Sequence, residues 1–247
     1  MLDKGLIAHI SDLRMRCESR NMLTHSEFLT PSEAALLTKD PGMCNSCFLF
    51  GGYDEAERVM LFFLPDYLSK ESSSVSECIT AIRCKAPFSD LTHRDYLGAL
   101  LSLGIKRSCI GDIMVGSEEA IILLDSKIAG YVIEHLNRIG RGGVSCTVID
   151  LSEIQPPTPR FREITATVAS LRADSVFSVA FGISREKVTQ LIKESVCMIN
   201  WLPFDSPSTT VSENDVLSAR GFGRAKLITI GGTSKKSRTF ITIHHYE

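Results

Sequence analysis

The segment between residues 77 and 151 constrains the fold most strongly, because its apolar spacing alternates between strand-like and helix-like in a fixed order. Short apolar runs bounded by polar residues predict strands, and apolar residues three and four apart predict helices. The expected order is βαββαβ. The predicted strands are residues 78–84, 110–115, 120–124 and 144–151, and the predicted helices are residues 94–103 and 127–139.

The ends of the two helices support this order. The first helix opens with Thr92-x-x-Asp95, a capping box, and the second runs into Gly140-Arg141-Gly142-Gly143, where glycine can take the left-handed conformation that stops a helix. About 75 residues in this order predict a ferredoxin-like (RRM-like) split βαβ domain over residues 76–155. Its strands lack the aromatic residues that stack bases in RNA-recognition modules, so base stacking on this sheet is not expected.

Residues 1–75 predict a small N-terminal α/β unit. Leu6, Ile10 and Leu13 share one helical face, and Thr30-Pro31-Ser32-Glu33 combines an N-cap, a first-turn proline and a capping-box glutamate for a second helix. Residues 47–50 and 58–64 predict a hairpin. The serine-rich stretch 69–76 predicts the boundary with the next domain.

A third domain is expected over residues 160–247, after the stiff segment Pro156-Pro157-Thr158-Pro159. Its predicted helices are residues 171–181 and 184–194. Its predicted strands are residues 161–169, 196–201 and 215–220, with a hairpin of 227–230 and 239–244 around Gly231-Gly232. The whole chain therefore predicts an α+β protein of three parts.

Charge is unevenly distributed. The chain has a net charge of −2, yet residues 171–247 hold ten Lys/Arg against seven Asp/Glu, which leaves a balance of −5 for residues 1–170. The C-terminal part is therefore mildly basic, as expected for a domain that contacts a polyanion.

Several cations of this part fall into clusters. Arg185 and Lys193 lie on one row of the second helix, Arg172 precedes the first helix, and Arg220, Arg224 and Lys226 follow on a glycine-flanked segment. We expect these cations to gather on one surface, where they match a repeating phosphate backbone. Ordinary solvated surface charge is the alternative that spacing alone leaves open.

A resemblance to a known family favours a phosphate-binding surface over ordinary solvated surface charge. The runs that carry it are Leu171-Arg172-Ala173-Asp174, Gly182-Ile183-Ser184-Arg185-Glu186-Lys187-Val188, Leu191-Ile192-Lys193, Ile199-Asn200 and Asp215-Val216. They resemble the S-four domain, also called the alpha-L RNA-binding motif. With Arg220-Gly221-Phe222-Gly223-Arg224 and residues 93–107, the chain resembles the bacterial YlmH family. Two departures are Ser195, where a glycine is usual, and the lack of a basic residue in residues 196–198.

The resemblance implies binding to structured RNA on the large ribosomal subunit, rRNA and tRNA being the expected partners, in rescue or quality control of stalled translation. It also implies a link to cell division, since the family is often encoded beside division proteins. The RNA-contacting residues that it implies are Arg172, Ser184, Arg185, Lys187, Gln190, Lys193, Asn200, Arg220, Arg224 and Lys226.

Other functions fit the sequence less well. An RNA-modifying enzyme of pseudouridine synthase type and a synthetase both need signature motifs that the chain lacks, and an adaptor for the division machinery stays open. Cys44-x-x-Cys47 lacks the two further ligands of a zinc site. We therefore expect no catalysis, cofactor, metal or small-molecule substrate. Without a signal peptide or a membrane span in the sequence, we expect a cytoplasmic protein with reduced thiols.

Overall fold

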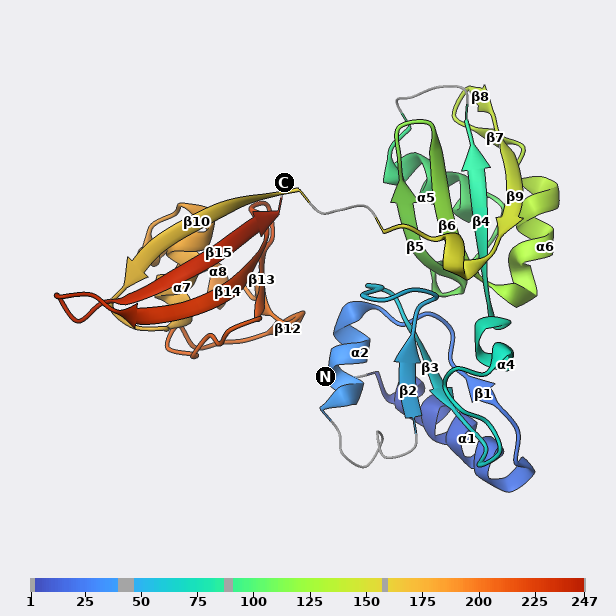
Figure 1. The fold of residues 1–247 in the computed structure, drawn as a ribbon, viewed down its shortest axis with the longest axis horizontal. Coiled ribbons are helices and arrows are strands. Elements are labelled where there is room, and N and C mark those ends of the chain that lie inside the picture. Colours follow the sequence, from blue (N-terminus) through green and yellow to red (C-terminus); the bar gives the residue numbers. More distant parts are fainter. Residues whose placement is uncertain (1–2, 40–46, 87–90, 157–159, 247) are drawn as a thin grey trace. The chain divides into compact units, whose positions relative to one another are not determined.

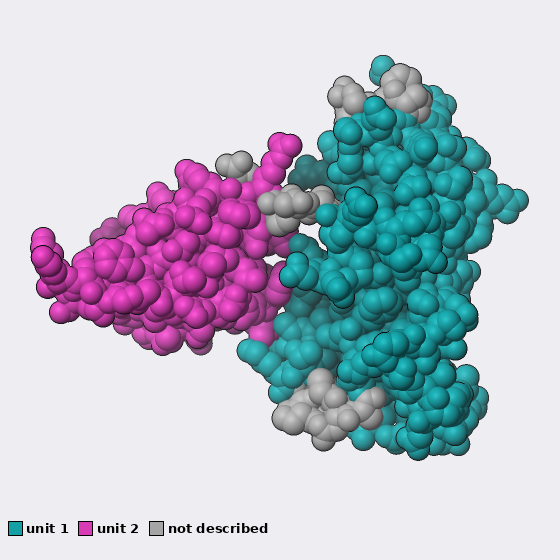
Figure 2. Space-filling model, in the orientation of Figure 1, with its two compact units in different colours: residues 1–157 teal, residues 158–247 magenta. Residues whose placement is uncertain are grey.

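The computed structural model describes residues 3–39, 47–86, 91–156 and 160–246. The chain divides into two compact units, residues 1–157 (unit 1) and 158–247 (unit 2), which have different colours in Figure 2. The division falls in the proline-rich segment that predicts a linker; residues 157–159 of that segment lie outside the described residues. In the described ranges, no helix combines the length and the apolar character needed to cross a membrane.

The first part of unit 1 is a three-stranded antiparallel sheet with two helices (Figure 1). The predicted capping box of the second helix is present, since Thr30 Oγ1 accepts from Glu33 N and Glu33 accepts from Thr30 N. The sheet order is β1-β3-β2, in which the two-residue strand β1 was not predicted. The elements are α1 (Lys4–Arg20), β1 (Thr24–His25), α2 (Pro31–Thr38), β2 (Cys47–Phe50) and β3 (Met60–Phe63).

The second part of unit 1 follows the predicted βαββαβ order. Its four strands form an antiparallel sheet in the order β5-β6-β4-β9. The second helix ends at His135, four residues before its predicted end, because residues 138–143 form a short two-stranded hairpin instead. The elements are α4 (Ser73–Ser76), β4 (Ile79–Lys85), α5 (His93–Ser102), η1 (Arg107–Cys109), β5 (Ile110–Val115), β6 (Glu119–Asp125), α6 (Ser126–His135), β7 (Arg138–Ile139), β8 (Gly142–Gly143), β9 (Ser145–Ile149) and η2 (Leu151–Glu153).

The two sheets of unit 1 share a core. One face of the four-stranded sheet packs on α5 and α6, and part of the other face, including Ala81 and Leu123, packs on Phe28, Met60 and Phe62. Gly111 permits this contact, because a Cβ there would lie 2.7 Å from the Phe28 ring.

Two charged residues join the sheets as well. The buried Arg58 side chain donates to the carbonyls of Phe28 (3.0 Å), Ile110 (2.8 Å) and Arg107 (3.3 Å). Burial, followed by repulsion from Arg107, lowers the pKa of Arg58 to about 10. Asp112 accepts from the backbone N–H groups of residues 57 and 58 and from the Tyr53 hydroxyl. Burial and the Asp112 carboxylate raise the pKa of Tyr53.

Unit 2 is a six-stranded antiparallel sheet with two helices on one face; in Figure 1 the helices lie behind strands β14 and β15. The predicted elements are observed in order in residues 161–246, and a two-residue strand at Leu202–Pro203 was not predicted. The sheet order is β10-β15-β14-β13-β11-β12. The elements are β10 (Phe161–Val168), α7 (Ala173–Phe181), α8 (Arg185–Lys193), β11 (Cys197–Ile199), β12 (Leu202–Pro203), β13 (Val216–Ala219), β14 (Gly223–Thr233) and β15 (Thr239–Tyr246).

The long hairpin of β14 and β15 differs from its prediction. Gly231-Gly232 does not form the turn but lies inside β14, where the register shifts between Ile230 and Thr233. A bulge of this kind takes up an extra residue, and glycine suits it because a Cβ at Gly231 would lie 3.3 Å from Phe240 Cβ. The turn lies at residues 234–238, where Ser234 N donates to the Arg238 carbonyl and Ser237 has a φ of 53°.

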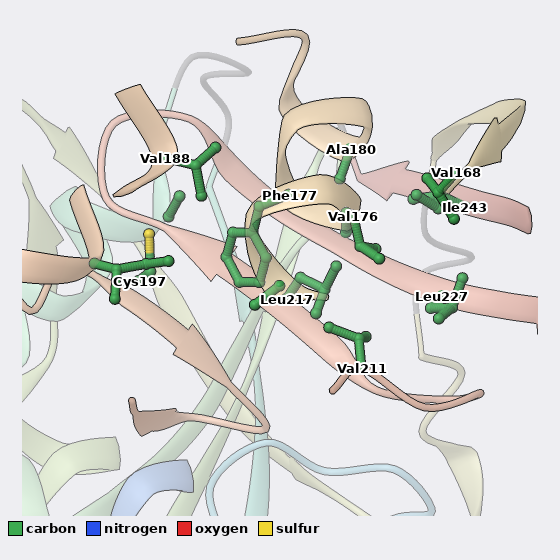
Figure 3. Close-up of a cluster of buried hydrophobic side chains, with 14 of the residues drawn as sticks. Val168, Val176, Phe177, Ala180, Val188, Cys197, Val211, Leu217, Leu227 and Ile243 are labelled. Carbon is green, nitrogen blue, oxygen red and sulfur yellow. The ribbon is translucent and has the colours of Figure 1, made fainter. Parts of the chain in front are cut away.

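The core of unit 2 explains the position of its helices. Phe177 lies among Val176, Val188 and Leu217 in Figure 3 and is fully buried, as are the inward-facing residues of β14 and β15, Ala225, Leu227 and Ile243. Alternate residues of each strand thus face α7 and α8, and the residues between them face the other way. This alternation decides on which face each charged strand residue lies.

We predict that Arg58→Met destabilises unit 1 by about 2–4 kcal/mol, because three carbonyls each lose one donor while methionine fills most of the same volume. Urea unfolding followed by far-UV circular dichroism measures this. Arg20→Met, at the exposed end of α1, is the matched control and should stay within about 0.5 kcal/mol. Equal stability of the two variants would contradict a structural role for the Arg58 guanidinium.

Candidate nucleic-acid interface

The two helices of unit 2 bring their N-termini together around one buried carboxylate. Asp174, in the first turn of α7, is only 5% exposed. It accepts from Arg172 Nε (3.1 Å) and Nη2 (3.3 Å), and it also pairs with Arg185 Nη2 at the first position of α8. The side chains of Arg172 and Arg185 remain 43% and 56% exposed. Two cations therefore share one anion and present their outer edges to solvent.

The environment of Asp174 keeps it ionised. Burial acts to raise the pKa of its carboxyl, but the hydrogen bonds and charges of Arg172 and Arg185 outweigh burial, so that the pKa is lowered. The position of the carboxylate at a helix N-terminus adds to this preference. The charge of Asp174 thus holds both guanidinium groups at fixed positions over the neutral pH range.

The loop before β13 fixes the start of α7. Ala173 N donates to the Thr209 carbonyl and Asp174 N donates to the Pro207 carbonyl, while Val211 N donates to the Leu171 carbonyl. The first two bonds occupy backbone donors at the helix start that otherwise have no partner within the helix. The position of Arg172 and Asp174 therefore depends on a segment more than thirty residues later in the chain.

The polar face of α8 carries the next predicted residues. Ser184 caps the helix by accepting from Lys187 N (3.2 Å). Lys187 Nζ donates to Gln190 Oε1 (3.3 Å), and Gln190 Nε2 donates to Glu194 Oε1 (2.8 Å). Lys193 is exposed.

The predicted residues on the two helices form a surface whose net charge is only mildly positive. We call the surface formed by Arg172, Ser184, Arg185, Lys187, Gln190 and Lys193 the helix surface. It holds four cations, and three acids lie beside them, namely Asp174, Glu186 and Glu194. Binding of RNA there would depend on the arrangement of individual donors more than on a strong overall field.

The expectation of one common surface is wrong for Arg224 and Lys226. Arg224 and Lys226 alternate with the buried Ala225 and Leu227 and therefore face away from α7 and α8. Arg224 lies over the Tyr246 ring, 6.0 Å from its centroid. Arg220 is exposed in the turn between β13 and β14.

Asn200 is another predicted RNA-contacting residue, and its amide is used within the domain. Its Nδ2 donates to Asp215 Oδ1 (2.7 Å) and its Oδ1 accepts from Val216 N (2.9 Å). Asn200 itself has a positive φ of 50°, a conformation that asparagine tolerates better than most residues. The structure thus gives Asn200 a role in holding the turn after β11.

Sequence reasoning missed two features of this unit. No role was predicted for Asp174, although an acid beside an arginine in the first turn of a helix indicates an ion pair there. The β14–β15 turn carries Lys235, Lys236 and Arg238, all exposed, and was not predicted to contribute. Ser195 replaces the usual glycine but still takes the left-handed conformation, with a φ of 55°.

The four-stranded sheet of unit 1 offers less to a nucleic acid. The face away from its helices is partly covered by Phe28, Met60 and Phe62. At its other end Arg83 lies between two acids, Glu119 (3.2 Å) and Glu153 (3.6 Å). No group of three or more potential metal ligands occurs among the residues that the structure describes; Cys44 lies outside them, and Cys17, Cys78, Cys84, Cys109, Cys146 and Cys197 form no disulfide.

Comparison with known proteins places the chain in a family. A family model described as "Putative RNA-binding domain in YlmH" matches residues 72–153. The ribosome-associated protein quality control protein P2 of Bacillus subtilis (strain 168) is 34% identical over 218 residues, which cover 88% of this chain and 85% of that protein. The chain belongs to the YlmH family. The YlmH domain match spans α4 to η2 and thus the four-stranded sheet of unit 1.

A solved structure shows a similar fold. The cell division protein ylmH from Streptococcus pneumoniae has a TM-score of 0.52 and 22% identity, covering 61% of this chain and 93% of that one. At this identity the likeness concerns the fold alone.

We predict that Asp174→Asn lowers the free energy of unfolding of unit 2 by about 1–3 kcal/mol, since two arginines lose their charged acceptor. Fluorescence of Trp201, the only tryptophan of the chain, follows unit 2 during urea unfolding. Asp205→Asn, at an exposed loop carboxylate, is the control and should change little.

The same effect should depend on pH. Because the folded-state pKa of Asp174 lies below the ordinary value of 3.8, its contribution is complete above that value and is lost as pH falls through the folded pKa. The stability difference between wild type and Asp174→Asn should therefore shrink as the pH falls below about 4. A constant difference over that range would show that the carboxylate charge is not the cause.

Proposed function

We propose that this chain is a non-enzymatic RNA-binding protein that binds structured rRNA and tRNA on the large ribosomal subunit during rescue or quality control of stalled translation. Its relative from Bacillus subtilis is named for ribosome-associated quality control, and its family domain is named for RNA binding. The observation on which the proposal rests is the pair of exposed arginines that Asp174 holds at the joined N-termini of α7 and α8.

The proposal assigns a fold to each part of the chain. The antiparallel order β5-β6-β4-β9 with two helices on one face supports a ferredoxin-like (RRM-like) domain over residues 76–155. The helix pair followed by β11 and β13 supports an S-four (alpha-L) domain over residues 160–247. We assign residues 1–75 to a small N-terminal α/β unit.

The helix surface suits folded RNA for a physical reason. Arginine donates two parallel hydrogen bonds to a phosphate, and a guanidinium that is already fixed by Asp174 loses little freedom when it does so. Ser184 and Gln190 can add neutral hydrogen bonds to riboses or bases along α8. This donor arrangement fits a shaped phosphate surface better than a small ligand.

We predict that Lys187→Glu combined with Lys193→Glu weakens binding to purified large ribosomal subunits at least about tenfold, because two cations of the helix surface become anions. These two lysines are chosen because a glutamate at Arg185 would face Asp174 and could unfold the helix pair. Co-sedimentation at about 50, 100 and 200 mM salt measures the effect, and wild-type binding should fall steeply over this range.

Arg20→Glu combined with Lys39→Glu is the matched control, since both residues are exposed in unit 1. Ribosome binding that does not change with salt concentration would contradict the proposal. An equal loss of ribosome binding in the control variant would also contradict it. A division adaptor is the competing function, suggested by the name of the Streptococcus pneumoniae protein. This alternative predicts that the wild type does not bind ribosomes. It also predicts that the Lys187 and Lys193 variant keeps its activity in cell division.

A further inference from the structure

The sheet of unit 2 has a second face that the helices do not cover. Both α7 and α8 pack against one face, through Phe177, Val188 and their neighbours. We call the opposite side the outer face. Its residues follow from strand alternation and from the register of β10, β15 and β14. They are Phe161, Glu163, Thr165, Thr167, Phe240, Thr242, His244, Tyr246, Arg224, Lys226 and Thr229.

The outer face carries aromatic rings where polar residues are usual. Phe161 is 43% exposed and Phe240 is 44% exposed, both on strands that turn their other side to the core. The Phe161 ring stacks on His244, with centroids 3.7 Å apart and planes inclined by 10°. Tyr246 lies beside the Arg224 guanidinium. Such flat, solvent-facing rings on a sheet are suited to stacking against unpaired bases.

Positive charge accompanies these rings. Arg224 and Lys226 lie on the outer face, and the β14–β15 turn adds Lys235, Lys236 and Arg238 beyond Phe240. Arg238 is held over β10 by hydrogen bonds to the hydroxyl and the carbonyl of Thr167. Within the described strands, the acid on this face is Glu163, whose carboxylate lies 3.5 Å from His244 Nε2.

Most of the positive excess of unit 2 therefore lies away from the helix surface. Residues 160–246 hold twelve Lys/Arg against seven Asp/Glu, and three of those seven acids lie on α7 and α8 or at their ends. The part of β14 from Arg224 to Thr233 is roughly 30 Å long at about 3.3 Å per residue. That length accommodates a stretch of at least about four nucleotides.

We propose that the outer face binds single-stranded RNA, with unpaired bases stacked on Phe161 and Phe240 and phosphates held by Arg224, Lys226 and the cations of the β14–β15 turn. A duplex fits less well, because paired bases cannot reach the rings. This site is separate from the helix surface, and it does not require the ribosomal role proposed above.

The test uses the full-length protein and a fluorescein-labelled oligouridine of about twelve nucleotides, followed by fluorescence anisotropy at about 100 mM salt. Phe161→Leu combined with Phe240→Leu should weaken binding at least about tenfold, because leucine keeps the apolar bulk and removes the stacking surface. Tyr67→Leu is the matched control, since Tyr67 is an exposed aromatic residue of unit 1 (66%) and should leave binding unchanged.

The charged residues provide an independent variant. Arg224→Gln combined with Lys226→Gln should also weaken binding and should lower the slope of log affinity against log salt by about 1.4, the value for two phosphate contacts on a single strand. Trp201 fluorescence and circular dichroism check that each variant is folded. If the phenylalanine variant does not fold, the change in salt slope decides.

Three results would overturn the proposal. They are unchanged oligouridine affinity in both outer-face variants, an equal loss in Tyr67→Leu, and binding of a labelled polyglutamate peptide, but not oligouridine, in a way that depends on Arg224 and Lys226. The last would identify an acidic protein as the partner. The Lys187 and Lys193 variant should keep its oligouridine affinity, which separates failure of this site from failure of the helix surface.

Discussion

The buried carboxylate of Asp174 is the interaction on which the organisation of unit 2 depends. A carboxylate at 5% exposure has lost most of its hydration, and ion pairs and hydrogen bonds must offset the free energy of that desolvation. Arg172 and Arg185 supply them from the starts of two different helices. The carboxylate thereby sets both the junction of α7 with α8 and the positions of two exposed cations. Asp174 therefore serves both the packing of the two helices and the proposed RNA-binding surface.

Unit 2 separates two kinds of chemistry on the two sides of one sheet. On the side of the helices, fixed guanidinium groups and short polar side chains suit the shaped backbone of folded RNA. On the outer face, exposed phenylalanines, a stacked histidine and a basic turn suit unpaired bases. Because the core fills the space between the two sides, each can be changed by mutation with little effect on the other. RNA that has paired and unpaired segments could engage both.

The four-stranded sheet of unit 1 differs from the sheet of unit 2 in what covers its two faces. The sheet that matches the YlmH domain has α5 and α6 on one face, and the first part of the chain covers part of the other. Arg58 and Asp112 add hydrogen bonds between those parts without adding exposed charge. The face that would stack bases in an RNA-recognition module is therefore partly a structural interface here.

Local patterns in the sequence were sufficient for the order of elements and for the ends of several of them. Apolar spacing predicted the βαββαβ order and the helix pair of unit 2, and Thr30 with Glu33 predicted a helix start, because these signals act between residues at most four apart. The resemblance of residues 171–226 supplied the residues of the helix surface. Only the tertiary structure decided how those residues are distributed. Arg224 and Lys226 face away from the helices because of strand pairing across the domain, and a bulge at Gly231-Gly232 moves the turn to residues 234–238. Asp174 meets Arg185 only when α7 and α8 pack on the sheet. Contacts of this kind join residues that are distant in the chain, and their geometry is set by the packing of the whole core.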